Sequence, residues 1–150
     1  MIIHAYLLDV AAATLKPVTL DSANTLAGLY SLIGCSLVDI VRIGDSHTLY
    51  CDDEGLTDGL RGFTLLDGHA APLAGNLVIA GTNAEGETTS ITEPLETFAA
   101  MLNVVRPVLY PIFETVDMPG VFGSRVRTFS ARLERSRPQI VGRCNAPASV

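Results

Sequence analysis

The most concentrated group of side chains that could do chemistry is the acidic run Asp52-Asp53-Glu54, with Asp58 close behind it. Hard divalent cations bind several carboxylate oxygens, so we treat Asp52, Asp53 and Glu54 as candidate ligand- or partner-binding residues. The run lacks the spacing of an EF-hand loop, and a solvated turn after a strand explains it more simply. We therefore predict no bound metal and no cofactor.

Nucleophilic catalysis would need a cysteine or serine beside a base. A site assembled from His47, Cys51 and Asp52 is the enzyme alternative that we keep. No zinc-ligand spacing links the cysteines and histidines, and residues 120–124 do not match a nucleophile elbow. We therefore favour a non-enzymatic protein and expect the cysteines to be structural; the scattered residues are Cys35, Cys51, Cys144, His4, His47 and His69.

The basic residues gather near the C-terminus. Residues 1–104 hold 13 acidic and 3 basic residues, a net charge of -10, whereas residues 105–150 hold 3 acidic and 7 basic ones, a net charge of +4. Arginines contact phosphates, but an acidic protein repels nucleic acid, which makes it the less favoured partner. Self-association and a solvated extension both stay open. The candidate partner-binding residues here are Arg125, Arg127, Arg132 and Arg135.

Periodicity predicts the elements that position these groups. Apolar residues at helical spacing, followed by Gly34, predict a helix over residues 22–33. A second set of apolar residues at this spacing predicts a helix after Pro94 that stops before Pro107. Residues 11–20 are read as a connection. The predicted strands are residues 2–10, 37–43, 47–52, 63–66 (or a helical turn), 76–80 and 87–91. The predicted core includes Leu26, Tyr30, Ile33, Val41, Leu49, Leu77, Ile79, Phe98 and Leu102.

The fold class that follows is α+β, with a small, mostly antiparallel sheet, two packed helices and a basic C-terminal extension. We divide the chain into an acidic domain of residues 1–104 and an extension of residues 105–150. Val126, Phe129 and Leu133 fall on one helical face after Ser124, and Arg125, Arg132 and Arg135 lie largely off it. This spacing predicts a basic amphipathic helix in the extension. We expect the last dozen residues to be loose.

Composition limits the class of protein. The chain has 150 residues, 48% of them hydrophobic and 17% charged, with a net charge of -6. Disordered chains are rich in charge and poor in apolar residues, so we expect the chain to fold. It has no apolar run of membrane-spanning length, no signal-peptide pattern and an odd number of cysteines. These features favour a cytoplasmic protein with no membrane partner.

Several segments between residues 32 and 102 also form an ordered pattern. They are Leu32-Ile33-Gly34-Cys35 at a helix end, the strand 38–43, the acidic turn 49–56, the glycine-flanked strand 75–81, the acidic turn 83–87 and a final helix. The pattern resembles an uncharacterised family catalogued as domain of unknown function 3846. Its members resemble small proteins of bacteriophages, plasmids and other mobile elements. Arg61-Gly62-Phe63-Thr64 departs from it, because relatives place an asparagine and a small residue there.

The resemblance implies a fold, a mobile-element origin and a bacterial host cytoplasm, but no catalytic residue. Our leading hypothesis is a small non-enzymatic binding protein that sequesters a host protein or a small ligand, in the service of anti-defence. One alternative is the enzyme described above. The other is a structural or regulatory subunit that forms homo-oligomers through its basic extension.

Overall fold

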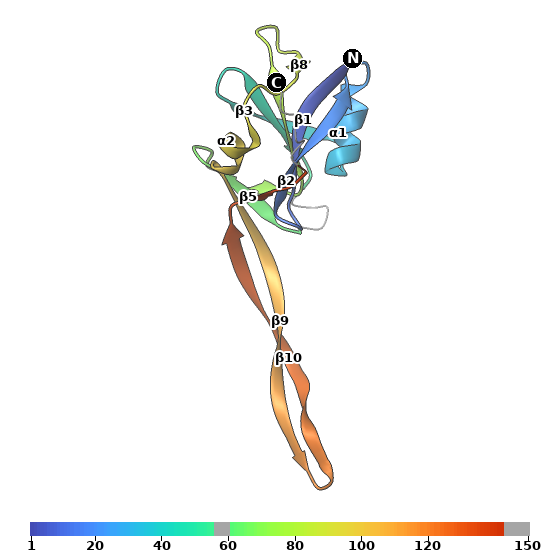
Figure 1. Cartoon of the computed structure of the whole chain (residues 1–150), viewed down its shortest axis with the longest axis vertical. Coiled ribbons are helices and arrows are strands. Elements are labelled where there is room, and N and C mark those ends of the chain that lie inside the picture. Colours follow the sequence, from blue (N-terminus) through green and yellow to red (C-terminus); the bar gives the residue numbers. More distant parts are fainter. Residues whose placement is uncertain (56–60, 143–150) are drawn as a thin grey trace, which may run out of the picture.

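The computed structural model describes residues 1–55 and 61–142, which form a body and a long arm (Figure 1). The arm is residues 105–135, and the body is the rest of the described chain. Within these residues, seven strands form one sheet in the order β11-β2-β1-β7-β4-β3, with β8 beside β7. Its strands are β1 (Ile2–Asp9), β2 (Thr14–Asp21), β3 (Val38–Ile43), β4 (His47–Asp52), β7 (Leu77–Thr82), β8 (Thr88–Thr89) and β11 (Gln139–Ile140).

A second sheet of four strands connects the body to the arm, in the order β10-β9-β5-β6. Its strands are β5 (Phe63–Leu66), β6 (Leu73–Ala74), β9 (Leu102–Met118) and β10 (Val121–Ser136). Neighbours pair antiparallel in both sheets, except that β11 runs parallel to β2. The chain leaves the body along β9, returns along β10 and joins the seven-stranded sheet as β11.

The seven-stranded sheet is covered on both faces. Side chains alternate along a strand, so Val78 and Ala80 of β7 face one side and Leu77 and Ile79 face the other. The first side packs under α1 (Thr25–Ile33), and the second packs against α2 (Leu95–Ala99) and the second sheet. Burial of β7 on both faces explains why its sequence is a continuous apolar run.

The helix predicted over residues 22–33 is present as α1. It ends where expected, because Gly34 has φ +80° and its N–H donates to the Tyr30 carbonyl (2.8 Å). It begins later than predicted, at Thr25, after Asn24. Leu29 and Ile33 are its buried residues, whereas Leu26, predicted to be in the core, is 51% exposed.

The predicted α+β class with two packed helices is wrong, because the chain is mostly strand. The second helix is only five residues long, and the chain is extended again from Leu102 onward. Residues 11–20, predicted as a connection, contain most of β2, in which Pro17 pairs with Tyr6. The hairpin predicted from residues 37–43 and 47–52 is confirmed as β3 and β4.

The extension is a twisted two-stranded hairpin, so the predicted amphipathic helix over it is also wrong (Figure 1). Met118 pairs with Val121 across a turn made by Pro119 and Gly120, and Gly120 has φ +83°. Proline followed by a left-handed glycine is typical of a type II turn. At roughly 3.4 Å per residue, residues 105–118 span about 45 Å. The division at residue 104 stays a prediction.

Candidate functional site

His47, Cys51 and Asp52 do not converge on one point. His47 and Cys51 lie on the same strand, β4, with two pleats between them, so their Cα atoms are about 13 Å apart. Asp52 follows Cys51 directly and so projects from the opposite face of the sheet. The fold therefore does not bring these three side chains together, as the enzyme alternative requires.

The two nitrogens of the buried His47 ring already have partners. Nδ1 lies 3.1 Å from the Ser46 hydroxyl, and Nε2 accepts from the Thr92 N–H at 3.5 Å, with the Thr92 hydroxyl at 3.3 Å. The ring also makes an edge contact with Phe98, at 5.2 Å between centroids. His47 therefore joins the segment before α2 to the sheet.

The Cys51 thiol is held in its protonated form. Burial raises its pKa to about 11, and the nearby carboxylates of Asp39, Asp53 and Asp52 act in the same direction. The thiol donates weakly to the Asp39 carbonyl at 3.7 Å. Because the thiolate is the nucleophilic form, this cysteine is inert near neutral pH. Cys144 lies outside the described residues.

The acidic run forms the turn that ends β4. Asp52 Oδ1 accepts a hydrogen bond from the Glu54 N–H (2.9 Å), and the Asp53 N–H donates to the Leu37 carbonyl (3.0 Å). Among residues 1–55 and 61–142, no three His, Cys, Asp or Glu side chains are placed to hold a metal ion. Asp58, also noted in the sequence, lies outside the described residues.

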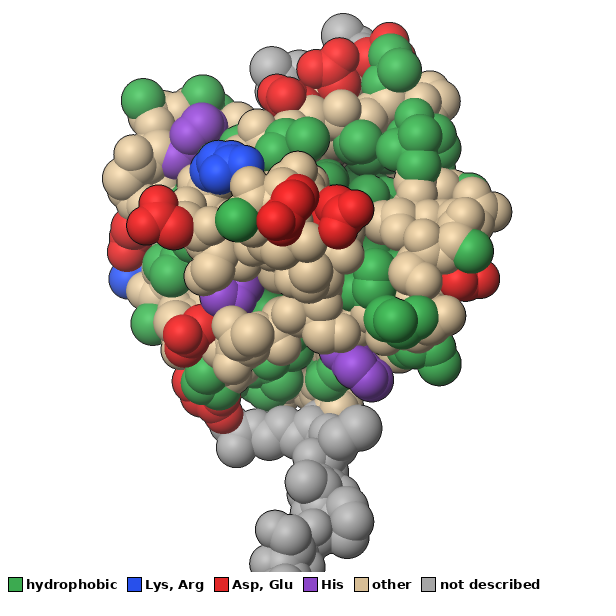
Figure 2. Space-filling view, turned by 90° about the horizontal axis from the view of Figure 1, so that it is seen from above, with side chains coloured by type: hydrophobic (Ala, Val, Ile, Leu, Met, Phe, Trp, Pro, Cys, Tyr) green, Lys and Arg blue, Asp and Glu red, His purple; other side chains and the backbone are tan. Residues whose placement is uncertain are grey.

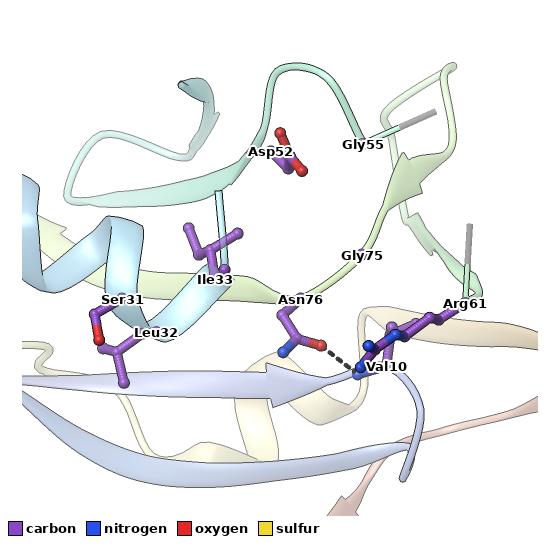
Figure 3. A pocket seen from close by; sticks show the side chains of 10 residues that line it. Val10, Ser31, Leu32, Ile33, Asp52, Gly55, Arg61, Gly75 and Asn76 are labelled. Carbon is purple, nitrogen blue, oxygen red and sulfur yellow. Dashed lines mark hydrogen bonds between the residues drawn. The ribbon is translucent and has the colours of Figure 1, made fainter. Parts of the chain in front are cut away.

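Two clefts border this turn. A cleft of about 320 Å³ is lined by Asp52, Arg61, Asn76 and the end of α1 (Figure 3). In it Asn76 Oδ1 accepts from the Val10 N–H at 3.0 Å, so this amide is used to join β1 to the start of β7. A second cleft, of about 450 Å³, is lined by Asp53, Glu54 and His69 together with apolar residues. Neither cleft presents a set of converging polar groups around one ligand position.

The candidate arginines of the extension all lie on β10, which runs from the tip of the arm to its base, whereas the acidic turn belongs to the body (Figure 1). Arg125 forms an ion pair with Glu114 of β9. Arg132 pairs with Glu134 (3.0 Å) and lies over the Tyr110 ring at 5.7 Å. Arg127 occupies a β-bulge, and Arg135 is exposed at the base of the arm. The structure therefore distributes these arginines among separate neighbours.

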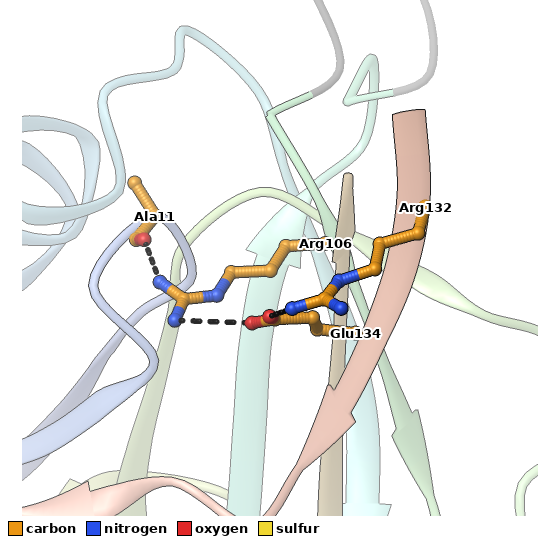
Figure 4. A network of polar contacts seen from close by, with 4 residues as sticks. All are labelled: Ala11, Arg106, Arg132 and Glu134. Atoms are coloured by element: carbon orange, nitrogen blue, oxygen red, sulfur yellow. Dashed lines mark hydrogen bonds and ion pairs between the residues drawn. The ribbon is translucent and has the colours of Figure 1, made fainter. Parts of the chain in front are cut away.

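The junction between arm and body is made by Arg106. Its Nη1 donates to the Ala11 carbonyl at 2.6 Å, and its Nη2 lies 3.8 Å from Glu134, which also holds Arg132 (Figure 4). Just after β10 ends, the Arg137 side chain donates to the Leu102 carbonyl at the start of β9 (3.1 Å). Arg106 thus joins the arm to the body, and Arg137 links the two chain segments at the base of the arm.

The register of β9 and β10 divides the arm into two unlike faces. Directly paired residues of antiparallel strands project to the same side. One side, which we call the polar face, carries the ion pairs, with Arg106 opposite Glu134 and Glu114 opposite Arg125. It also holds Val108, Tyr110, Ile112, Val116 and Met118. The other side, which we call the apolar face, is defined by Pro107, Leu109, Pro111, Phe113, Val126, Phe129, Ala131 and Leu133.

The apolar face is open to solvent in the single chain. Its exposed fractions are 69% for Leu109, 60% for Phe113, 63% for Phe129 and 63% for Leu133. Contiguous exposed apolar surface of this kind marks sites of interaction with other molecules. Sequence reasoning missed these residues, although the short continuous apolar run from 107 to 113 is a detectable signal of a strand.

The end of the body opposite the arm has a different character. Figure 2 shows acidic side chains dispersed over this face, with few lysines or arginines and with scattered hydrophobic residues between them. In the described part of the chain, neither helix is long or apolar enough to cross a membrane.

Comparison with known proteins places the chain in a family. The model of the domain of unknown function DUF3846 matches residues 3–103, so the match ends where the arm begins. The uncharacterized protein y4iR of Sinorhizobium fredii is 33% identical over 145 residues, with 91% of this chain and 88% of that protein covered. Protein PsiB of Rhizobium leguminosarum is 29% identical, with 81% and 94% covered.

The two alignments reach further than the family model. Residues 104–150 make up almost a third of the chain, so an alignment that covers 91% of it must include much of the arm sequence. No solved structure matches the chain. The extent of the family match shows that the chain belongs to the DUF3846 family.

Proposed function

We propose that this member of the family is a non-enzymatic binding protein whose contact element is the arm. The observation that carries the proposal is the exposed apolar face of residues 107–133, displayed on a hairpin about 45 Å long. A soluble chain rarely exposes so much contiguous apolar surface unless another molecule covers it.

The arrangement of charges favours a protein as the partner. A nucleic-acid surface needs arginines aimed at successive phosphates. Here Arg125 is paired with Glu114, and Arg132 is paired with Glu134 and lies over Tyr110. The opposite side of the hairpin is apolar, which suits the core of a protein interface.

The candidate catalytic residues support a non-enzymatic role. His47 has partners at both nitrogens, and the pKa of the Cys51 thiol is raised to about 11. The hypotheses of host-protein sequestration and of a subunit that assembles through its extension both need a protein-binding surface. The arm, rather than the acidic turn at residues 52–54, is where we place that surface.

A crosslinking experiment in the bacterium that makes the protein tests this function. We expect the full chain to give crosslinked protein adducts that the double variant Phe113→Ser/Phe129→Ser loses. The control is Ile112→Ser, which changes the polar face at the neighbouring position and should keep the adducts. Adducts that persist unchanged in the double variant would refute binding through the apolar face.

A further inference from the structure

We infer that the partner of the apolar face is a second copy of this chain, with the two arms packed face to face and pointing in opposite directions. The inference rests on the proposed function, because it names the protein that the arm binds. In such a dimer a two-fold axis would cross the middle of the arms, near the paired residues Pro111 and Phe129.

The arm needs a covering layer to be stable. An isolated two-stranded hairpin is marginal in water, and beyond the β5 pairing at residues 63–66 the described chain gives this hairpin no third strand. At about 200 Å² for a large side chain, Leu109, Phe113, Phe129 and Leu133 expose on the order of 500 Å². With Val126 and the prolines, this approaches the roughly 800 Å² per partner of a standard interface.

Two prolines direct the contact to the face of the arm rather than to the edge of β9. Pro107 and Pro111 lie four residues apart, so the positions where their N–H groups are missing lie on the same edge of the strand. Proline in a ladder occurs where the missing N–H would point away from the partner strand. The outer edge of β9 therefore lacks the donors at Pro107 and Pro111, and this disfavours edge-to-edge pairing with an added strand.

The charges at the two ends of the apolar face select the direction. Arg135 lies on this face at the base of the arm, opposite Val105, and Asp117 lies on it near the tip, opposite Phe122. Both side chains are exposed. Antiparallel arms bring Arg135 of each copy to the level of Asp117 of the other, one strand across, whereas parallel arms would place like charges at the same level.

The bodies favour the same direction. Residues 1–104 carry a net charge of -10, so two bodies side by side would repel each other. Antiparallel arms separate the bodies by about the 45 Å length of the arm, several times the Debye length of roughly 8 Å at physiological ionic strength. Self-association through this face therefore avoids the main electrostatic cost of bringing together two acidic chains.

Apolar levels of the two arms also meet in this arrangement. With the axis at Pro111 and Phe129, the level of Leu109 and Ala131 in one copy meets the level of Phe113 and Val126 in the other. The axis lays β9 over β9 and β10 over β10, so Leu109 meets Phe113 and Ala131 meets Val126. The surface is self-complementary, as a two-fold interface requires.

The first test is the mass of the full chain in solution. We expect sedimentation velocity to give twice the 15.9 kDa of one chain at micromolar concentration. Phe129→Ser removes an apolar anchor from both copies and should weaken the dimer about 100-fold or more, whereas Ile112→Ser on the polar face should leave it intact. Far-UV circular dichroism of each variant checks that the body stays folded.

The second test is charge reversal, which does not depend on removing apolar surface. Arg135→Glu and Asp117→Arg should each weaken the dimer about tenfold, and the double variant should restore it. A double variant weaker than either single variant would overturn the antiparallel arrangement. A monomeric full chain would overturn self-pairing, and the crosslinked adducts described above would still decide whether the arm binds a different protein.

Discussion

The body and the arm are both built from β-strands, but they treat their apolar side chains in opposite ways. In the body, Leu77, Val78, Ile79 and Ala80 of one central strand are completely buried, because a helix covers one face of the sheet and a second sheet covers the other. In the arm, a single two-stranded layer leaves its apolar face in solvent. The body completes its contacts within one chain, and the arm requires a partner.

The largest expected effect on stability comes from removing a phenylalanine ring from the body, compared with removing one from the arm. Phe98 is 1% exposed and contacts the rings of Tyr6 (5.8 Å) and His47 (5.2 Å). Phe98→Ala should lower the free energy of unfolding by about 3–5 kcal/mol, because it leaves a cavity in the core. The matched variant Phe129→Ala should leave unfolding of the body unchanged at concentrations where the chain is monomeric. Urea titration followed by circular dichroism measures both, and equal losses would erase the contrast.

A glycine pair gives the next largest difference. A Cβ at position 81 would lie 2.5 Å from the Ser90 carbonyl oxygen, whereas a Cβ at position 123 would have no atom within 4 Å. Gly81→Ala should therefore destabilise the body by about 1–3 kcal/mol through overpacking, and Gly123→Ala should have little effect. Melting temperatures of the two variants and the parent test this. A large loss in Gly123→Ala would mean that the arm is packed in the free chain.

Part of the body could be predicted from local sequence signals. Gly34 ends α1 as expected, and the paired strands β3 and β4 lie where their β-branched residues and the Gly44 turn place them. The strand β2 was missed because Pro17 argued for a connection. Proline is tolerated there because β11 pairs only with residues 14 and 15, so that the rest of β2 is an edge of the sheet.

The arm was misread because of the β-bulge at Arg127. In a regular strand, Val126 and Phe129 would project to opposite faces. The bulge adds one residue, so Val126 opposite Phe113 and Phe129 opposite Pro111 lie on the same face. The resulting spacing of three residues, followed by Leu133, imitates the apolar stripe of a helix.

The interface that we propose on the arm differs from the candidate sites that the sequence suggests. Only 17% of the residues are charged, so clusters of charge stand out in the sequence. They direct attention to Asp52, Asp53, Glu54 and the arginines. The apolar residues that became the candidate interface are indistinguishable in sequence from core residues. Only the number of layers around them, a tertiary property, shows that Phe113 and Phe129 are exposed.

The junction between the regions should give an intermediate effect. Arg106→Met keeps the apolar stem but removes the hydrogen bond to the Ala11 carbonyl and the contact with Glu134. We expect a loss of about 1–2 kcal/mol in local stability, because a charge-assisted hydrogen bond contributes somewhat more than a neutral one. Backbone hydrogen exchange at residues 11–13 and at the base of the arm should become faster. Unchanged exchange there would show that pairing with β5 alone fixes the base of the arm.

The smallest effect should come from the ion pair on the polar face. Arg125 is well exposed and its partner Glu114 is partly exposed, so Glu114→Gln should cost less than about 1 kcal/mol. Hydrogen exchange of arm amides should therefore change little in this variant and much more in Phe129→Ser, provided that the concentration is high enough for the partner to be bound. If Glu114→Gln instead opened the arm as much as Phe129→Ser, the cross-strand charges would hold the hairpin by themselves. The arm would then be stable within a single chain, as the body is, and its exposed apolar face would no longer require a partner.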